Sequence, residues 1–329
     1  MRTHLGPLLL GLAVLALPRP LQSEPRPEPP PVAPEVVTID AGDRTLHGVL
    51  YRPVGPGPFP AVLYNHGSAP GMLNQQAFDV LGPLFANRGW VFFAPYRRGQ
   101  GLSAQAGRCI GDDIADARRR GLWQGCAVVV PLLALVWLGV LRRQRRATRL
   151  AAVVALTLCG GFATHVWAQR AGAATMVRLL YTEQFADQRV AFDWLWRQPF
   201  AQAGRIATAG NSFGGIMAVL AAERADYCAG VDAAGGAESW AAAPGLRRLM
   251  DVAARRARVP ILFIQAENDY DVSPSYALAE AMREAGKTAA VKIYPRFGQS
   301  RAEGHSFAWR GSAIWGDDVF RFLSEHCGG

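Results

Sequence analysis

Ser212 lies at the centre of a Gly-x-Ser-x-Gly pattern formed with Gly210 and Gly214. The residues before it predict a short apolar strand, and those after it predict a helix. A sharp turn between the two would expose the serine hydroxyl at the carboxyl end of a sheet, with backbone N–H groups close behind it. Glycines at these two positions leave room for a tightly turned backbone. Because the chain has 35 glycines, the pattern alone is weakly specific, and a nucleophile also needs a base, an acid and an oxyanion hole.

Candidates for the acid and the base follow later predicted strands. In an open parallel sheet, functional side chains collect beyond the carboxyl ends of the strands. The loop after the strand at residues 261–264 offers Asp269 or Asp271, and Asp232, past the preceding strand at Cys228, is a weaker substitute. His305 follows the last predicted strand, and we place it in a loop. The competing histidines fall elsewhere: His47 in a strand, His66 in the loop after a strand, His165 in an apolar run and His326 in the last helix.

The length suits one large α/β domain with a small extra part, or two small domains, and the composition argues against some classes of partner. Half of the 329 residues are hydrophobic. The net charge is +9, but the basic residues are nearly all arginine and form no groove interleaved with aromatic residues, so we predict no nucleic-acid partner. The five cysteines have no metal-binding spacing, and we expect no metal and no cofactor. Cys109, Cys228 and Cys327 could form at most one disulfide, which leaves the redox compartment open.

The first residues have the pattern of an export signal. A short basic start, an apolar stretch of about a dozen residues and a processing region near Ser23 predict a signal peptide over residues 1–23. The apolar stretch is too short to span a bilayer comfortably; a buried N-terminal helix is the alternative. Residues 24–35 are rich in proline and predict an extended linker. We therefore expect the globular part, which begins at Val36, to be exported.

Short apolar strands alternate with helical stretches through the globular part. The alternation holds over residues 36–121 and again over residues 169–329, which we treat as two parts of one domain. Strands that alternate with helices predict a mostly parallel, doubly wound sheet covered on both faces. The predicted fold class is therefore α/β.

Residues 122–168 interrupt this alternation. Two apolar runs, a strong one at residues 122–141 and a weaker one at residues 150–168, flank a basic turn that contains five arginines. Because about 20 apolar residues span a bilayer, this stretch predicts a transmembrane helical hairpin whose basic turn faces the cytoplasm. A helical lid over the active site is the alternative. The first run carries no charge and lacks the polar face that such a lid needs.

Outside the hairpin, the chain from about residue 36 to residue 325 resembles the α/β-hydrolase superfamily, most closely its dienelactone hydrolase and prolyl-oligopeptidase-like branches. Five segments carry the resemblance: Asn65-His66-Gly67-Ser68, Arg98-Gly99-Gln100-Gly101-Leu102-Ser103, residues 205–215, residues 268–272 and Gly304-His305-Ser306. The order Ser, Asp, His is that of the α/β-hydrolases. Dienelactone hydrolases use a cysteine where Ser212 stands, the prolyl-oligopeptidase-like enzymes carry a β-propeller that this sequence lacks, and the hairpin departs from both. The resemblance therefore predicts the fold rather than the substrate.

The resemblance also implies the site. It places the acid at the first aspartate of the Asp-x-x-Val stretch, which completes a triad of Ser212, Asp269 and His305. Backbone N–H groups of Phe213 and of the Gly67-Ser68 loop would form the oxyanion hole. Pocket candidates, chosen for their place in loops, are Trp240, Tyr270 and Trp309.

The expected activity is hydrolysis of carboxylic esters through an acyl-enzyme intermediate. A serine peptidase is the alternative among enzymes, and a membrane-tethered binding protein on an inactive hydrolase fold is the alternative of another class. Because no acidic clamp for a peptide amine is evident, we favour a small-molecule ester over a short peptide. The signal peptide and the hairpin together predict an exported, extracytoplasmic domain that contacts the lipid bilayer through residues 122–168.

Overall fold

The computed structural model describes residues 32–68, 72–139, 145–224 and 226–328. The predicted signal peptide, residues 1–23, and most of the predicted linker, residues 24–35, lie outside the described part of the chain. The first strand, β1 (Glu35–Asp40), begins one residue before the predicted start of the domain at Val36.

An eight-stranded sheet runs through the domain in the order β1-β2-β4-β3-β5-β6-β7-β8. The β1–β2 and β2–β4 pairs are antiparallel, and the pairs from β4 to β8 are parallel. This confirms the predicted mostly parallel sheet. The strands after β1 are β2 (Thr45–Tyr51), β3 (Phe59–Asn65), β4 (Val91–Pro95), β5 (Ala201–Asn211), β6 (Gly230–Ala233), β7 (Ile261–Ala266) and β8 (Ala289–Tyr294).

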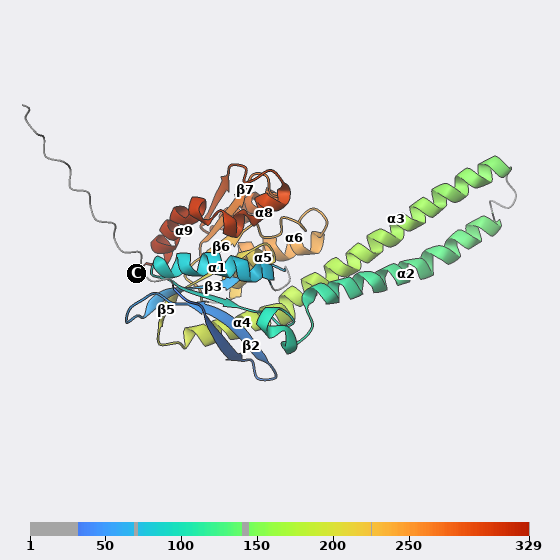
Figure 1. Cartoon of the computed structure of the whole chain (residues 1–329). Helices are drawn as coiled ribbons and strands as arrows, with labels where there is room; N and C mark the ends of the chain where they lie inside the picture. The colour runs from blue at the N-terminus through green and yellow to red at the C-terminus, as the bar shows by residue number, and fades with distance from the viewer. Residues whose placement is uncertain (1–31, 69–71, 140–144, 225, 329) are drawn as a thin grey trace, which may run out of the picture. The chain divides into compact units, whose positions relative to one another are not determined.

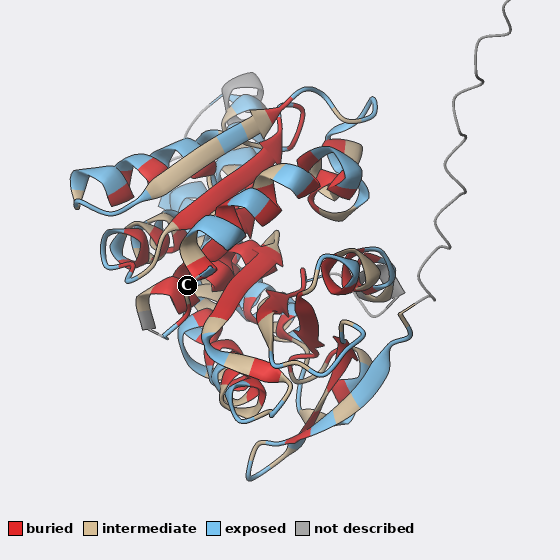
Figure 2. Ribbon diagram, turned by 90° about the vertical axis from the view of Figure 1, so that its left-hand side faces the viewer, coloured by how far each residue is buried: buried red, intermediate tan, exposed pale blue. Residues whose placement is uncertain are grey.

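Alternate residues of the central strands face opposite sides of the sheet. Leu63 and Phe93 belong to one hydrophobic cluster, whereas their neighbours Val62 and Phe92 belong to another, as the two-residue period of a strand requires. The first cluster includes residues of α4 (Phe185–Trp196), α5 (Phe213–Arg224), α6 (Pro244–Arg255) and α7 (Ser273–Glu284), and the second includes residues of α1 (Met72–Asn87), α8 (Arg301–Arg310) and α9 (Ser312–Cys327). Helices therefore cover both faces, and Figure 2 shows the buried strands between them.

The insert forms a hairpin of two long helices. Helices α2 (Ile110–Gly139) and α3 (Arg146–Leu179) lie side by side along most of their length (Figure 1). Both extend beyond the predicted range of residues 122–168. Asp112 and Asp113 in the first turn of α2 favour an earlier helix start. At the other end, α3 continues through a turn of π-helix, η3 (Leu180–Gln184), into α4.

Small residues allow the two hairpin helices to approach closely. A Cβ atom added at Gly121 would lie 2.8 Å from the Cβ of Ala171, and one added at Gly125 would lie 3.1 Å from the Cα of Thr164. Larger side chains at these positions would therefore separate the helices. Close packing at small residues four positions apart is typical of transmembrane helix pairs.

Many large apolar side chains of the hairpin are exposed. They are Leu122, Trp123, Val128, Val130, Leu132, Leu135, Val136, Trp137, Leu138, Val154, Leu158, Phe162 and Trp167. The helix α2 and the helical run Ala151–Trp196 are both long and apolar enough to cross a membrane, and only 11% of the most apolar window of α2 is buried. A core helix of a water-soluble domain would be mostly buried. A large exposed apolar surface of this kind is typical of a site that contacts a membrane or another protein.

A buried ion pair closes the base of the hairpin. Arg98 lies before α2 in the sequence and Asp187 lies after α3, in α4. The guanidinium Nη2 of Arg98 donates to Asp187 Oδ1 at 2.6 Å and its Nε donates to Oδ2 at 2.9 Å. The backbone N–H of Arg98 also donates to Oδ2 at 2.9 Å, and Arg44 donates to Oδ1 at 3.2 Å. The first residue of the Arg-Gly-x-Gly-x-Ser segment thus joins the two parts of the α/β domain.

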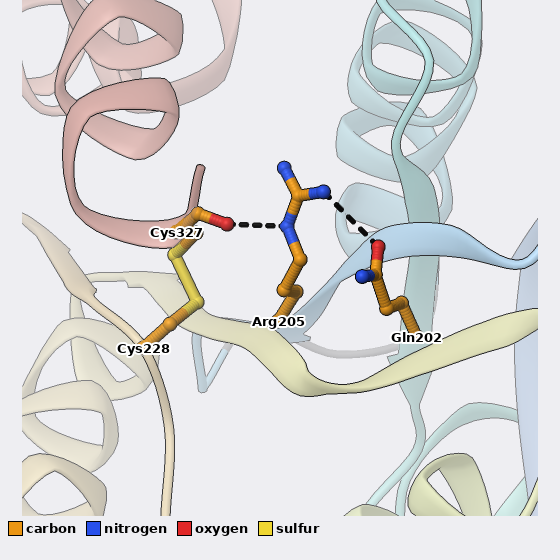
Figure 3. The surroundings of a disulfide bond; sticks show 4 residues. All are labelled: Gln202, Arg205, Cys228 and Cys327. Carbon is orange, nitrogen blue, oxygen red and sulfur yellow. Dashed lines mark hydrogen bonds between the residues drawn. A yellow bond between two sulfur atoms is a disulfide. The ribbon is translucent and has the colours of Figure 1, made fainter. Parts of the chain in front are cut away.

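A disulfide joins Cys228, just before β6, to Cys327, at the end of α9 (Figure 3). Cys109 is free, which agrees with the prediction of at most one disulfide among the three. Beside the bridge, Nε of Arg205 donates a hydrogen bond to the carbonyl oxygen of Cys327 (Figure 3). The bridge therefore attaches the C-terminal helix to the middle of the sheet.

Removing this disulfide is expected to lower the free energy of unfolding by about 2–5 kcal/mol, because a cross-link across a long loop restricts the unfolded chain. The loop here spans 99 residues. The double variant Cys228→Ala/Cys327→Ala tests this by urea unfolding, with Cys159→Ala, which removes an exposed free cysteine, as the matched control. Equal midpoints for the double variant and the control would contradict the expectation.

Candidate active site

Ser212 occupies a strained turn between β5 and α5. Its φ angle is +54°, in the left-handed region that side-chain-bearing residues rarely adopt. A Cβ atom at Gly210 would lie 2.2 Å from the carbonyl oxygen of Gly214, and one at Gly214 would lie 1.7 Å from the carbonyl oxygen of Asn65. The turn therefore requires glycine at both flanking positions, and it directs Ser212 into a cavity.

His305 and Asp269 form a hydrogen-bonded pair at the same cavity. Nδ1 of His305 lies 2.8 Å from Oδ1 of Asp269. Because a carboxylate only accepts hydrogen bonds, Nδ1 carries the proton and Nε2 is left as an acceptor. Nε2 is buried and has no partner among the described residues, and His305 and Ser212 both line the cavity. The arrangement leaves a base free to take a proton from a hydroxyl group.

The prediction that His305 lies in a loop is wrong, because His305 lies in helix α8. A capping box starts this helix. Ser300 Oγ accepts a hydrogen bond from the Glu303 N–H at 3.2 Å, and Glu303 Oε2 accepts one from the Ser300 N–H at 2.9 Å. The Ser-x-x-Glu spacing is a sequence signal for a helix start, and Ser300 and Glu303 have this spacing at the start of α8.

The two alternative acids form other contacts. Oδ1 of Asp271 accepts the Ser273 N–H at 2.9 Å, at the start of α7. Oδ1 of Asp232 accepts the Gly235 N–H at 2.7 Å, and burial, against the effect of this hydrogen bond, raises the pKa of Asp232 to about 7. Within the part of the chain that the structure describes, only Asp269 of the three is hydrogen-bonded to His305.

The pKa of His305 is raised above its ordinary value of 6.5. Burial alone would lower this pKa, but the hydrogen bond to Asp269 and the negative charges of Asp269 and Glu238 outweigh burial. Glu238 lines the cavity with Ser212 and His305. A base with a raised pKa stays protonated to a higher pH, and a protonated base cannot accept a proton.

We therefore expect kcat/KM for an ester to fall as the pH drops through a value above 6.5, where His305 gains its proton. Glu238→Gln removes one charge that raises the pKa of His305, so the acid limb should move to lower pH. A pH profile of kcat/KM with p-nitrophenyl acetate measures this shift, and Glu325→Gln on α9 is the control. A limb that stays in place or moves to higher pH in Glu238→Gln would contradict the assignment.

The predicted oxyanion donors lie at both sides of Ser212. Phe213 is the first residue of α5, and the first N–H groups of a helix have no partner within it. Gly67 and Ser68 follow β3 and line the same cavity as Ser212. These positions can supply N–H donors to a negatively charged oxygen that forms beside the serine.

Arg97 connects the two sides of this predicted oxyanion hole. Its side chain is buried, and it donates to the carbonyl oxygen of His66 at 2.8 Å and to that of Gly67 at 2.9 Å. The guanidinium carbon also lies 4.9 Å from the centre of the Phe213 ring. Burial lowers the pKa of Arg97 to about 9, so the group remains a cation at neutral pH.

Among the described residues, Ser212 lines two cavities. The larger has a volume of about 710 Å³, and its lining includes His305, Trp309 and Glu238. The smaller has a volume of about 250 Å³ and extends toward the hairpin. Of the predicted pocket residues, Trp309 lines the larger cavity, Tyr270 packs with its ring 5.3 Å from that of His305, and Trp240 is not part of the described lining of either cavity.

Sequence reasoning missed Arg97 and Glu238. Arg97 directly precedes the Arg-Gly-x-Gly-x-Ser segment, but only the fold shows that it is buried against His66 and Gly67. Glu238 follows the carboxyl end of β6, where a search beyond each strand could have found it. Among the described residues, no group of three or more His, Cys, Asp or Glu side chains is arranged to hold a metal ion.

Comparison with known proteins gives a family and a fold. A family model described as "Dienelactone hydrolase family" matches residues 145–318. No curated protein matches the sequence.

Solved structures with a similar fold include an esterase from Pyrococcus furiosus, which is 12% identical with a TM-score of 0.55; the match covers 90% of this chain and 92% of the esterase. The acylaminoacyl peptidase of Pyrococcus horikoshii is 16% identical with a TM-score of 0.54, and the match covers 89% of this chain and 41% of that one. A puromycin-hydrolyzing peptidase of Mycobacterium tuberculosis is 15% identical with a TM-score of 0.57, and the match covers 90% of this chain and 40% of that one. The chain thus spans about two fifths of the length of the two peptidases. At these identities the likeness establishes the α/β-hydrolase fold.

Proposed function

The chain belongs to the dienelactone hydrolase family and is a hydrolase, and we propose that it cleaves carboxylic esters with Ser212 as nucleophile. The observation that carries this proposal is the hydrogen bond between His305 and Asp269, which leaves Nε2 of His305 without a partner among the described residues, in a residue that lines the same cavity as Ser212. An inactive hydrolase fold used only for binding has less support, because none of the three side chains is missing.

In the proposed mechanism, Nε2 of His305 takes the proton of the Ser212 hydroxyl as Oγ attacks the ester carbonyl carbon. Asp269 holds the ring orientation and stabilises the imidazolium that forms. Collapse of the tetrahedral intermediate breaks the bond to the alcohol oxygen, which receives the proton from His305. A water molecule, deprotonated in turn by His305, then attacks the acyl-enzyme and releases the acid.

The negatively charged oxygen of each tetrahedral intermediate would accept hydrogen bonds from the N–H groups of Phe213 and of the Gly67-Ser68 loop. The loss of one such donor typically costs about 2.7–4 kcal/mol of transition-state stabilisation. Arg97 supports this role because it holds the carbonyl groups of the loop and packs on the Phe213 ring.

Steady-state hydrolysis of p-nitrophenyl acetate by the full chain tests the proposal. We expect turnover that saturates with substrate and stops after treatment with a fluorophosphonate. An absence of hydrolysis with a correctly folded protein would instead favour the binding role.

A peptidase is the second candidate, and one observation favours it. The carboxylate of Glu238 lies in the cavity with Ser212 and His305, where it could bind the amino group of a short peptide. A panel of fluorogenic aminoacyl amides compared with p-nitrophenyl esters distinguishes the two, since a preference for the amides would replace the ester proposal.

We also propose that residues 122–168 cross the membrane as a hairpin between the two parts of the hydrolase domain, residues 36–121 and 169–329. Support comes from the exposed apolar side chains of α2 and α3 and from the close packing at Gly121 and Gly125. The arginines of the turn would face the cytoplasm, which leaves the hydrolase domain on the other side. The disulfide suits such a location, because disulfides persist in oxidising compartments.

Cys159 provides a test of the hairpin in the full chain, because it is an exposed free cysteine of α3. We expect a membrane-impermeant maleimide to leave Cys159 unmodified in intact membranes, since the bilayer would cover it. Ala115→Cys, at an exposed position near the start of α2, should react under the same conditions. Mass spectrometry locates the modified residues, and rapid modification of Cys159 in the absence of detergent would favour the water-soluble lid.

A further inference from the structure

The smaller cavity at Ser212 is partly built by the hairpin. Residues from the start of α2 and the end of α3 line it together with Ser212 and residues of α5, and we call it the hairpin-root pocket. The hairpin contributes Ile110, Gly111, Ile114, Arg118 and Met176. Ile110, Ile114 and Arg118 are spaced by four residues and so form one stripe of α2. The insert therefore contributes directly to the surroundings of the nucleophile.

The position of His305 distinguishes the two cavities. His305 lines the larger cavity and is absent from the described lining of the hairpin-root pocket. In the proposed mechanism, His305 must protonate the departing alcohol, so the alcohol oxygen has to lie on the His305 side of Ser212. The acyl group then extends to the opposite side, into the hairpin-root pocket.

The lining of this pocket combines polar residues, among them Arg118 and Glu238, with apolar side chains that suit an aliphatic chain. Ile110 and Ile114 of α2, Met176 of α3 and Phe213 and Ile216 of α5 present apolar groups to it. Its volume is about 250 Å³, which is room for an acyl chain of modest length. Flexible methionine side chains fill irregular gaps in this kind of surface and adapt to different occupants.

The pocket also lies close to the expected membrane surface. Ile114 is eight residues before Leu122, and Met176 is eight residues after Ala168, so at 1.5 Å per residue both lie about 12 Å from the apolar segments. The polar headgroup layer on each side of a bilayer is about 5–8 Å thick. The two helices thus place the pocket just outside the headgroups, and they lead to it from the hydrocarbon region.

We propose that the hairpin-root pocket binds the acyl chain of a lipid ester that reaches Ser212 from the bilayer. The proposal rests on the proposed roles of Ser212 and of the hairpin, and it specifies the substrate class of the same site. Ester hydrolysis of short soluble substrates tests the proposed function alone, whereas dependence on chain length and on the location of the ester tests this inference.

The first experiment measures kcat/KM for p-nitrophenyl acetate, butyrate, hexanoate and octanoate with the full chain. Burial of the acyl chain should raise kcat/KM by up to about fourfold per added methylene until the pocket is full. Ile114→Trp should reduce the ratio of octanoate to acetate at least about tenfold, because it fills the pocket, and Ile114→Ala should move the optimum to longer chains. Ala115→Trp, on the exposed side of the same turn, should leave the chain-length profile unchanged.

A flat chain-length profile, or identical profiles for Ile114→Trp, Ile114→Ala and Ala115→Trp, would overturn the acyl pocket while leaving the serine hydrolase intact. Opposite shifts in the two Ile114 variants would support the pocket, since a general loss of stability cannot lengthen the preferred chain. If Ile114→Trp does not fold, Ile114→Ala still decides the question.

The second experiment tests the source of the ester. In one sample, phosphatidylcholine vesicles contain both the full chain and 4-methylumbelliferyl oleate. In the other sample, vesicles that contain the full chain are mixed with separate vesicles that carry the ester. We expect a higher initial rate of hydrolysis when the ester and the protein share a membrane, because the ester can then diffuse laterally to the hairpin. Equal initial rates would overturn supply from the bilayer.

Discussion

Ser212→Ala is expected to lower kcat for p-nitrophenyl acetate by about 10⁴–10⁶-fold, because loss of the nucleophile leaves only the rate enhancement from binding and from oxyanion stabilisation. Ser212 has a φ angle of +54°, and no other described serine combines a positive φ angle with a place in the cavity that His305 lines. Alanine carries no hydroxyl, so no acyl-enzyme can form.

Measurement of kcat and KM with the purified full chain checks this result, and Ser324→Ala, at an exposed site on α9, is the matched control. The circular dichroism spectrum and the melting temperature of Ser212→Ala should match those of the unaltered protein. Retention of more than about 1% of kcat in a folded Ser212→Ala variant would exclude this serine as the nucleophile.

Asp269→Asn is the second large effect, with an expected loss in kcat of about 10⁴-fold. Asp269 accepts the Nδ1–H of His305 at 2.8 Å. An asparagine amide can donate to Nδ1 instead, which would move the histidine proton to Nε2 and remove the acceptor that Ser212 needs. Loss of the carboxylate also removes the charge that stabilises the imidazolium.

Asp271→Asn is a matched control from the same loop. Asp271 accepts the Ser273 N–H and, in the described structure, has no hydrogen bond to His305. Its replacement should change kcat less than about tenfold, in contrast to Asp269→Asn. A larger loss for Asp271→Asn than for Asp269→Asn would reverse the assignment of the acid.

Local sequence was sufficient to predict the strand, turn and helix around Ser212. The steric demand on Gly210 comes partly from the nearby carbonyl group of Gly214, whereas the atoms nearest to a Cβ at Gly214 belong to Asn65 and His66, in and after β3. The alternation of strands and helices likewise reflects local patterns, so the mostly parallel sheet followed from the sequence. Helix ends were less predictable, because α2 and α3 continue beyond their apolar segments into charged residues.

Contacts between distant segments could not be predicted in the same way. The residues around Arg97 in the sequence do not indicate that its guanidinium donates hydrogen bonds to the carbonyl groups of His66 and Gly67. The pairing of Cys228 with Cys327 and the approach of Ile114 to Ser212 also depend on the completed fold. The wrong prediction for His305 has a different cause. The capping box of Ser300 and Glu303 can be recognised in the sequence, and it favours a helix where we predicted a loop.

The most direct measurement for the central claim is to label the full chain with a fluorophosphonate and to locate the adduct by peptide mass spectrometry. The reagent loses fluoride to an activated serine oxygen and forms a stable phosphonate ester. We predict one adduct, on Ser212, which is absent in Ser212→Ala and forms much more slowly in Asp269→Asn. An adduct on a different serine, or no adduct with the folded protein, would contradict the proposal that Ser212, His305 and Asp269 form a hydrolytic site.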